Sequence, residues 1–288
     1  MRLKKGPPDV ILLFTTLTLI AIGMIMVFSS SSIKANLEYN DAYYFFKRHG
    51  IWVSLGLVAM FICMKPHYQK LKHLALPLLL LAFAGLILLL TPLGIEINGA
   101  TRWLEIGGFR FTPSEFAKLA VVLFLAHSIS QKINKIKSFA EGILPYMIIL
   151  ALACALIMAQ PDLGTSVALA GTVFFMLFMA GARISHLLAI TVSGVALAGA
   201  AIYVADYRME RLIAFLDPWK YAQNEGFQII QSLYALASGG LFGMGLGRSR
   251  QKFFYVPEPH TDFIFAILGE ELGFIGAFFI IIIGRASC

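Results

Sequence analysis

Asp262 lies near the end of the segment Pro257–Phe263, where a long polar loop runs into an apolar stretch able to cross a membrane. A carboxylate at such a boundary meets water on one side and lipid on the other. A positioned carboxylate can take a proton from an attacking hydroxyl group. The position therefore predicts general-base chemistry on a membrane-anchored substrate, with Asp262 as the base. His260 is a candidate to orient this carboxylate, although a single loop histidine is more often only solvated.

Glu115 and Lys118 form a second group that could do chemistry. They are three residues apart, early in the fourth apolar stretch, so they share one face of a helix. Ionisable side chains within a membrane usually face the protein interior or a wet cavity. A salt bridge that holds two helices together is one interpretation. A polar site near the outer face, at about the level of Asp262, is the interpretation that the predicted topology favours.

Glu270 and Glu271 lie two turns into the last apolar stretch, roughly 12 Å along a helix. Two adjacent carboxylates in hydrocarbon should be paired, or one of them should be protonated. A proton or ion path is one hypothesis. Structural pairing with another part of the helix bundle is the hypothesis that we favour.

Glycine recurs through Gly240–Gly247, just before the basic residues Arg248, Arg250 and Lys252. The stretch lacks the Gly-Lys-Ser/Thr ending of a P-loop and follows no predicted strand, so we exclude a nucleotide site. Backbone amides beside the three basic side chains could hold a phosphate group. Attraction of a basic loop to anionic lipid headgroups is an equally good interpretation.

The composition places these residues in a membrane protein. Of the 288 residues, 59% are hydrophobic and only 14% are charged, whereas about a quarter are charged in a soluble domain. The net charge of +7 fits Lys and Arg in cytoplasmic loops, so we expect no nucleic-acid partner. The three cysteines are isolated in sequence, which predicts neither a disulfide framework nor a metal site.

A helix needs roughly twenty apolar residues to cross the hydrocarbon core. Eight stretches approach this length, at about 10–31, 49–64, 74–93, 113–129, 142–159, 165–182, 186–204 and 263–283. We therefore predict an all-α polytopic membrane protein, with residues 1–288 forming a single membrane domain. Asp162 lies in the tight turn between the fifth and sixth stretches, where it should cap the following helix.

The distribution of charge predicts the orientation. With the N-terminus inside, one set of loops receives many Lys and Arg residues and, as acids, only Asp9 and Glu141. The positive-inside rule then places both ends of the chain in the cytoplasm. Two loops face outward, at about 94–112 and 205–262.

The second outer loop is too long for an ordinary connection. Its residues 209, 212, 213 and 216 form an apolar helical stripe that could lie in the membrane interface. The segment Asp217–Trp219 should end this helix. We predict a second helix over Phe227–Ala237.

Several motifs then converge on one family. The chain resembles the SEDS proteins (shape, elongation, division and sporulation), most closely the sporulation and division members, over nearly its whole length. The resemblance is carried by the stretches Asn98–Trp103, Thr112–Lys118, Gln160–Gly164, Gly226–Ser232 and Gly240–Gly273. Family members have about ten spans. Eight are predicted here, so we expect the usual last pair of helices to be absent.

The resemblance implies a peptidoglycan glycosyltransferase that polymerises lipid II at the outer face of the bacterial cytoplasmic membrane. The essential aspartate of the family motif corresponds to Asp262, which would act as the base. The substrate-binding candidates are Arg102, Glu115, Lys118, Arg248, Arg250, Lys252 and His260, and the basic ones would offset charge on the departing pyrophosphate. A divalent cation, Mg²⁺ or Mn²⁺, could assist, although no metal-ligand cluster is visible. The implied partners are lipid II, membrane lipids and a class B penicillin-binding protein.

Two other functions compete with this one. A flippase for a lipid-linked precursor would line its route with Glu115, Lys118, Glu270 and Glu271. An inactive short form would only recruit the penicillin-binding protein. The best-placed charged groups cluster at the outer level of the membrane, which favours the enzyme. Division, elongation and spore-cortex roles are not distinguished by these motifs.

Overall fold

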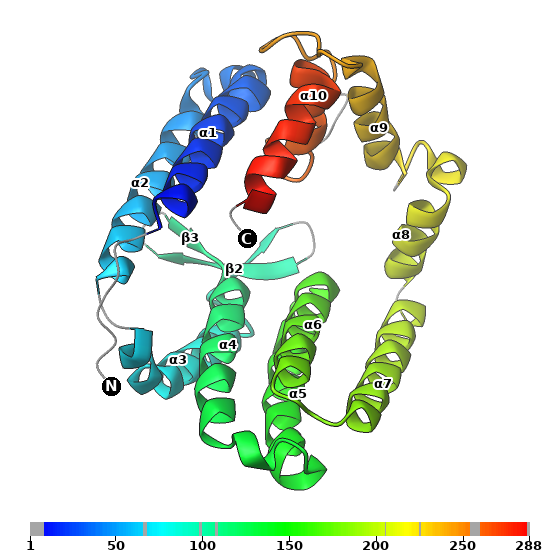
Figure 1. Ribbon diagram of the computed structural model, residues 1–288. Helices are drawn as coiled ribbons and strands as arrows, with labels where there is room; N and C mark the ends of the chain where they lie inside the picture. Colours follow the sequence, from blue (N-terminus) through cyan, green and yellow to red (C-terminus); the bar gives the residue numbers. More distant parts are fainter. Residues whose placement is uncertain are drawn as a thin grey trace. The chain divides into compact units, whose positions relative to one another are not determined.

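The computed structural model describes residues 9–65, 68–97, 100–106, 109–204, 206–224, 226–253 and 260–286. Its elements, in chain order (Figure 1), are α1 (Val10–Tyr39), α2 (Tyr44–Met64), η1 (Tyr68–His73), α3 (Ala75–Leu88), β1 (Gly94–Ile97), β2 (Ala100–Ile106), β3 (Phe109–Phe111), α4 (Pro113–Gln131), η2 (Ile133–Lys135), η3 (Phe139–Ile143), α5 (Leu144–Met158), α6 (Leu163–Met179), α7 (Ile184–Tyr203), α8 (Asp206–Leu216), η4 (Pro218–Tyr221), α9 (Phe227–Gly239) and α10 (Ile264–Ala286).

Each of the eight apolar stretches predicted to span the membrane coincides with a helix, which confirms the helical membrane fold. In the described part of the chain, five helices are long and apolar enough to cross a membrane: α1, α2, Phe139–Met158, α7 and Ile264–Arg285. The helices α3 and α6 are apolar but shorter, with 14 and 17 residues. The helix α4 has 19 residues and carries Glu115 in its first turn.

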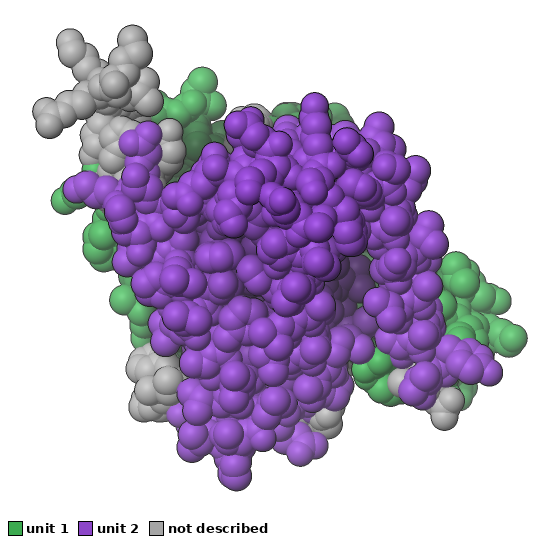
Figure 2. All heavy atoms as spheres, turned by 90° about the horizontal axis from the view of Figure 1, so that it is seen from below, with its two compact units in different colours: residues 1–65, 205–288 green, residues 66–204 purple. Residues whose placement is uncertain are grey.

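The chain divides into two compact units (Figure 2). Unit 1 consists of residues 1–65 and 205–288, and unit 2 consists of residues 66–204. The single membrane domain expected from the sequence therefore stays a prediction, and each unit is described by itself.

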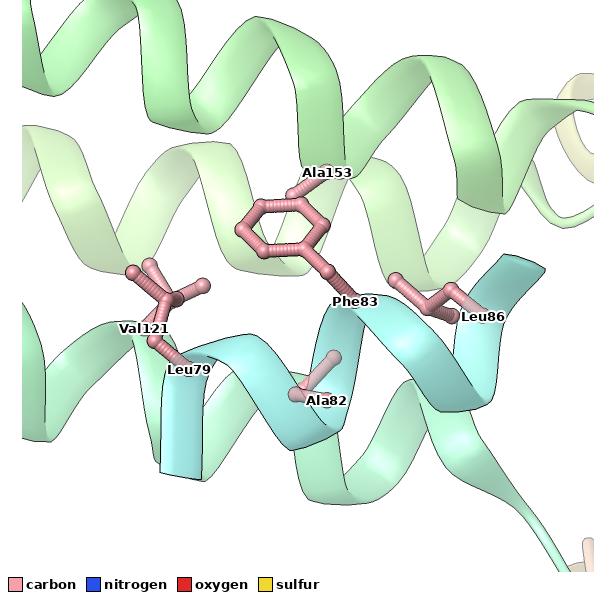
Figure 3. Close-up of a pocket in the computed structure, with 7 residues that line it drawn as sticks. Leu79, Ala82, Phe83, Leu86, Val121 and Ala153 are labelled. Carbon is pink, nitrogen blue, oxygen red and sulfur yellow. The ribbon is translucent and has the colours of Figure 1, made fainter. Parts of the chain in front are cut away.

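In unit 2, α3, α4, α5 and α6 pack around one apolar core. The helix α4 turns Ala117, Val121 and Leu125 into it, at the four-residue spacing that places side chains on one helix face. Phe83 and Leu86 of α3 meet these helices at the centre (Figure 3), and the side chains there enclose no space large enough for a water molecule. Unit 2 therefore offers a close-packed support rather than an internal cavity at this point.

A small antiparallel sheet, in the order β1-β2-β3, lies beside this bundle in unit 2 (Figure 1). It occupies the segment that the sequence predicted to be an outer loop, so the all-α expectation is incomplete here. Leu104 pairs with Gly94 on one side and with Phe111 on the other. The sequence of β2 does not alternate strictly between polar and apolar residues, because Thr101 and Arg102 are adjacent, as are Trp103 and Leu104. The strands also have only three to seven residues.

In unit 1, α1 packs against α2 and α10, and α9 packs against α10 (Figure 1). The two helices predicted for the long loop 205–262 are confirmed as α8 and α9. Asp217 follows the last residue of α8, as the sequence predicted, and the short helix η4, which was not predicted, begins at the next residue.

The helix α10 is broken at Gly273, where φ is 70° and ψ is −173°. A break leaves backbone groups without helical partners, and such groups must be satisfied inside a membrane protein. Four hydrogen bonds between the glycine-rich loop 240–245 and α10 satisfy these backbone groups. The amides of Met244 and Gly245 donate to the carbonyls of Glu270 and Glu271, at 2.9 and 3.0 Å, and the amides of Phe274 and Ile275 donate to the carbonyls of Gly240 and Leu241, at 2.9 and 3.1 Å.

The glycine-rich loop thus completes the backbone of α10. The amides of Gly243, Met244, Gly245 and Arg248 all donate to carbonyl oxygens of the protein, so these four amides are not available to hold a phosphate group. The hypothesis that backbone amides of this loop hold a phosphate group is therefore wrong for these four residues.

Candidate functional site

Asp262 is exposed and lies in the turn that leads directly into α10. The carbonyl of Phe263 accepts hydrogen bonds from the amides of Ala266 and Ile267, at 3.0 and 3.3 Å. The first turn of the helix is therefore formed immediately after Asp262, which places the carboxylate at the end of a rigid element. The residues 254–259, which include the beginning of the sequence motif, lie outside the described residues.

His260 lies against the start of α2 in unit 1. Its ring centroid is 4.5 Å from that of Phe45, with the planes tilted by 41°. The start of α2 is itself fixed by Asp41, which accepts hydrogen bonds from Lys47 Nζ and the Tyr43 amide, at 2.8 and 2.9 Å. The hydrogen bond from Lys47 holds the pKa of Asp41 below its usual range. His260 is therefore packed against an aromatic ring, and the expectation of simple solvation is wrong.

Glu270 and Glu271 are almost completely buried, each 1% exposed. The carboxylate of Glu270 accepts hydrogen bonds from the amides of Arg250 and Gln251, at 2.9 and 3.3 Å, and from the Ser249 hydroxyl. Amides of the basic loop do bind an anion, as the sequence allowed, but that anion is a carboxylate of the same chain.

Lys252 supplies the counter-charge to this pair. Its Nζ lies 3.1 Å from Oε1 of Glu271, and it also reaches the Gly247 carbonyl at 2.7 Å and Ser29 Oγ at 3.3 Å. The three donor positions of the ammonium group are thus all used inside unit 1. This confirms the structural pairing favoured for the two glutamates.

The structure separates the basic cluster that was expected to bind pyrophosphate. Arg248 and Arg250 are exposed, whereas Lys252 is 6% exposed. Lys252 is therefore corrected from a substrate-binding candidate at the surface to a buried ion-pair partner, because its loop folds the side chain back onto α10. Arg248 and Arg250 keep their place as candidates in unit 1.

The pair Glu115 and Lys118 forms the salt bridge that its spacing predicted, with Lys118 Nζ 2.8 Å from Oε2 of Glu115. Both groups belong to α4, so this bridge does not join two helices. The Glu115 side chain is 63% exposed and that of Lys118 is 33% exposed. The pair is consequently accessible on the first turns of α4 in unit 2.

Arg102 lies on β2, and its guanidinium group holds the turn between α5 and α6. It donates from Nη2 to the Pro161 carbonyl at 2.5 Å and from Nε to the Gln160 carbonyl at 3.5 Å. Asp162 caps α6, as predicted, by accepting a hydrogen bond from the Thr165 amide at 3.1 Å. The contacts of Arg102 thus give it a structural role within unit 2.

Two residues of the buried cluster were missed by sequence reasoning. Ser29 on α1 donates to both oxygens of Glu271, at 2.7 and 2.9 Å, and Ser249 donates to Glu270. For Ser29 the available signal was the serine run 29–32 within an apolar helix, because hydroxyl groups in membrane helices can bond across to a neighbour. Within the described ranges, no group of three or more His, Cys, Asp or Glu side chains could hold a metal ion, so we name no metal ligand.

Comparison with known proteins assigns the family. The family model described as "FTSW_RODA_SPOVE: Cell cycle protein" matches residues 10–285. The chain belongs to this family. The SEDS resemblance that the motifs indicated is thereby confirmed.

Among the relatives of this family, the chain is 45% identical to "Stage V sporulation protein E" of Bacillus subtilis (strain 168), over 98% of this chain and 78% of that protein. It is 42% identical to "Probable peptidoglycan glycosyltransferase FtsW" of Geobacter sp. (strain M18), over 96% of this chain and 75% of that protein.

Solved structures share the fold. One, described as "Structural coordination of polymerization and crosslinking by a peptidoglycan synthase complex", matches with a TM-score of 0.74 and 27% identity, over 96% of this chain and 75% of that chain. The rod shape determining protein RodA of Thermus thermophilus matches with a TM-score of 0.62 and 24% identity, over 96% of this chain and 72% of that chain.

Proposed function

We propose that this chain is a peptidoglycan glycosyltransferase that polymerises lipid II at the outer face of the bacterial cytoplasmic membrane. The observation that carries the proposal is its 39–42% identity, over 93–96% of its length, to FtsW proteins named as probable peptidoglycan glycosyltransferases. The exposed carboxylate of Asp262, next to the rigid first turn of α10, supports the same reaction.

In the proposed reaction, Asp262 accepts the proton of the 4-hydroxyl group of one GlcNAc. The hydroxyl oxygen forms a bond to the anomeric carbon of a second sugar. The bond from that carbon to undecaprenyl pyrophosphate breaks, and the pyrophosphate leaves with the electron pair. A single displacement of this kind inverts the anomeric carbon and needs one base but no protein nucleophile.

The direct experiment is polymerisation of lipid II by the purified chain in liposomes, with and without a class B penicillin-binding protein. Glycan strands that require lipid II and this chain would support the proposal. A preparation that binds lipid II and the partner but makes no strands would favour the scaffold. The same assay with EDTA, Mg²⁺ or Mn²⁺ would test the divalent-cation hypothesis.

The flippase remains the second candidate because broken helices and buried carboxylates are typical of transporter binding sites. Here, however, the carbonyls at the break are bound by loop amides, and both carboxylates are bound by Lys252, serine hydroxyls and backbone amides. Among the described residues, the two carbonyls and the two carboxylates are thus held by partners within the chain, and this favours the enzyme. Movement of labelled lipid II between leaflets, without strand formation, would favour the flippase.

Arg248 and Arg250 are the proposed ligands of the departing pyrophosphate, since both are exposed in the outer loop. We expect Arg248→Ala with Arg250→Ala to lower the polymerisation rate on the order of 100-fold, because charge on the leaving group loses its stabilisation. The matched control is Lys220→Ala, which removes an exposed basic residue from the same outer loop. A double variant with the wild-type rate would remove these residues from the site.

We propose that both ends of the chain are cytoplasmic and that the loop 205–262 faces outward. In a background without native cysteines, Lys220→Cys should react with a membrane-impermeant maleimide in spheroplasts. Lys65→Cys, at the end of α2, should react only after permeabilisation. Both positions are exposed, so the reverse labelling pattern would invert the topology.

A further inference from the structure

One buried cluster brackets the stretch of chain that carries Asp262. Ser249 and Lys252 precede the stretch 253–262, and Glu270 and Glu271 follow it on α10. We propose that these two glutamates are positioning residues for Asp262. They hold the turn 249–252 against α10 and thereby fix both ends of the intervening chain. The inference rests on the proposed function only in taking Asp262 as the base.

Glu270 fixes the backbone of the turn. Within the described residues, its oxygens accept hydrogen bonds from three donors, the amides of Arg250 and Gln251 and the hydroxyl of Ser249. Ser249 in turn accepts a hydrogen bond from the Lys252 amide at 3.2 Å. A glutamine at position 270 would turn its own NH₂ donors toward some of these donors. The amide variant therefore keeps the shape of the side chain but breaks the contact.

Glu271 fixes the turn through charge. Its carboxylate accepts hydrogen bonds from Lys252 Nζ and from the Ser249 amide, the latter at 3.5 Å. The Ser29 hydroxyl donates to both of its oxygens. The Lys252 side chain is 4% exposed and that of Glu271 is 0% exposed. Loss of either partner would leave a buried charge uncompensated, whereas loss of both would not.

These contacts bear on catalysis because of chain geometry. Asp262 lies in the turn just before α10, which begins at Ile264, and Glu270 follows Ile264 by six residues, about 9 Å of helix at 1.5 Å per residue. Ten residues separate Lys252 from Phe263, and such a stretch could reach about 30 Å if one end were released. A displacement of the base by about 1 Å can lower the rate on the order of 100-fold. The contact of His260 with Phe45 at 4.5 Å is a further restraint in the same stretch.

The first test uses a charge cycle in the polymerisation assay. Glu271→Gln and Lys252→Met should each lower kcat on the order of 100-fold, with KM for lipid II unchanged. The fold-decrease in kcat of the double variant should be smaller than the product of the fold-decreases of the two single variants, because the double variant leaves no unpaired buried charge. Glu38→Gln, an exposed carboxylate of α1, is the control and should match wild type. If the two fold-decreases in kcat simply multiplied in the double variant, the proposed coupling of Glu271 to Lys252 would be overturned.

The second test does not depend on activity. Spin labels at Thr261→Cys and Phe14→Cys, in a background without native cysteines, report the distance from the Asp262 stretch to α1; both positions are exposed. Pulsed electron paramagnetic resonance should give one narrow distance distribution in the otherwise wild-type chain. Glu270→Gln and Glu271→Gln should broaden it at a temperature at which both variants remain folded.

The two measurements separate the possible failures. An equally narrow distribution in the glutamine variants would overturn the positioning role, whatever the activity. Broadening in a chain that makes no glycan strands under any condition would keep the positioning role and remove the proposed reaction. Narrow distributions with reduced kcat would assign the two glutamates a direct effect on the reaction, and this too would overturn the inference.

Discussion

Asp262→Asn is expected to cause a large fall in the rate of lipid II polymerisation. General-base catalysis contributes typically 10²–10⁴-fold, and an asparagine side chain cannot take the proton from the attacking hydroxyl. The rate of strand formation should fall by about this factor, while KM for lipid II and copurification with a class B penicillin-binding protein stay unchanged. Gel analysis of labelled glycan strands, beside a pull-down of the partner, measures both effects.

Two variants make this result specific. Asp217→Asn neutralises another exposed carboxylate of the loop 205–262 and should leave the rate unchanged. Asp262→Glu keeps the base but moves it by one methylene, so it should retain partial activity. Wild-type polymerisation by Asp262→Asn would remove the base from the proposed mechanism. Loss of partner binding in the same variant would indicate a folding defect instead.

Gly273→Ala is expected to cause a large loss of stability. Its backbone lies in a region open almost only to glycine, which costs another residue about 1–3 kcal/mol. An added Cβ would also lie 2.3 Å from the Gly243 amide nitrogen and 2.6 Å from the Leu241 carbonyl oxygen. Because both are backbone atoms, we expect a total loss above about 3 kcal/mol, seen as a lower Tm in detergent.

Gly247→Ala separates the two contributions. Gly247 also has a positive φ, 77°, but an added Cβ would meet nothing within 4 Å. This variant should lose only about 1–2 kcal/mol, the cost of the left-handed backbone. Equal decreases in Tm for both variants would show that the close approach of the loop to α10 does not matter for stability.

The sequence by itself determined what depends on composition and on near neighbours. A hydrophobic content of 59% requires a lipid environment, and the apolar stretches located the helices that the structure contains. Local patterns were equally decisive. Asp162 caps the helix that begins one residue later, and Glu115 meets Lys118 across one helical turn. In each case the partner is within a few residues, so helix geometry alone fixes the contact.

Short strands escaped this reasoning. The sequence of β2 lacks the strict polar–apolar alternation of a half-buried strand, and strands of three to seven residues become stable only when they pair with one another. Sequence periodicity over so few residues does not distinguish such strands from a polar loop. The sheet was therefore set by tertiary pairing.

Only the tertiary structure decided how the buried charges are paired. Glu271 meets Ser29, 242 residues away in the chain, and Lys252, 19 residues away. The glycine-rich loop, which could have faced a phosphate, instead completes the broken backbone of α10. A buried carboxylate or a free carbonyl must find a donor, but the chain offers many donors. The choice among them depends on which elements pack together, and this brings Lys252 inside while Arg248 and Arg250 remain exposed.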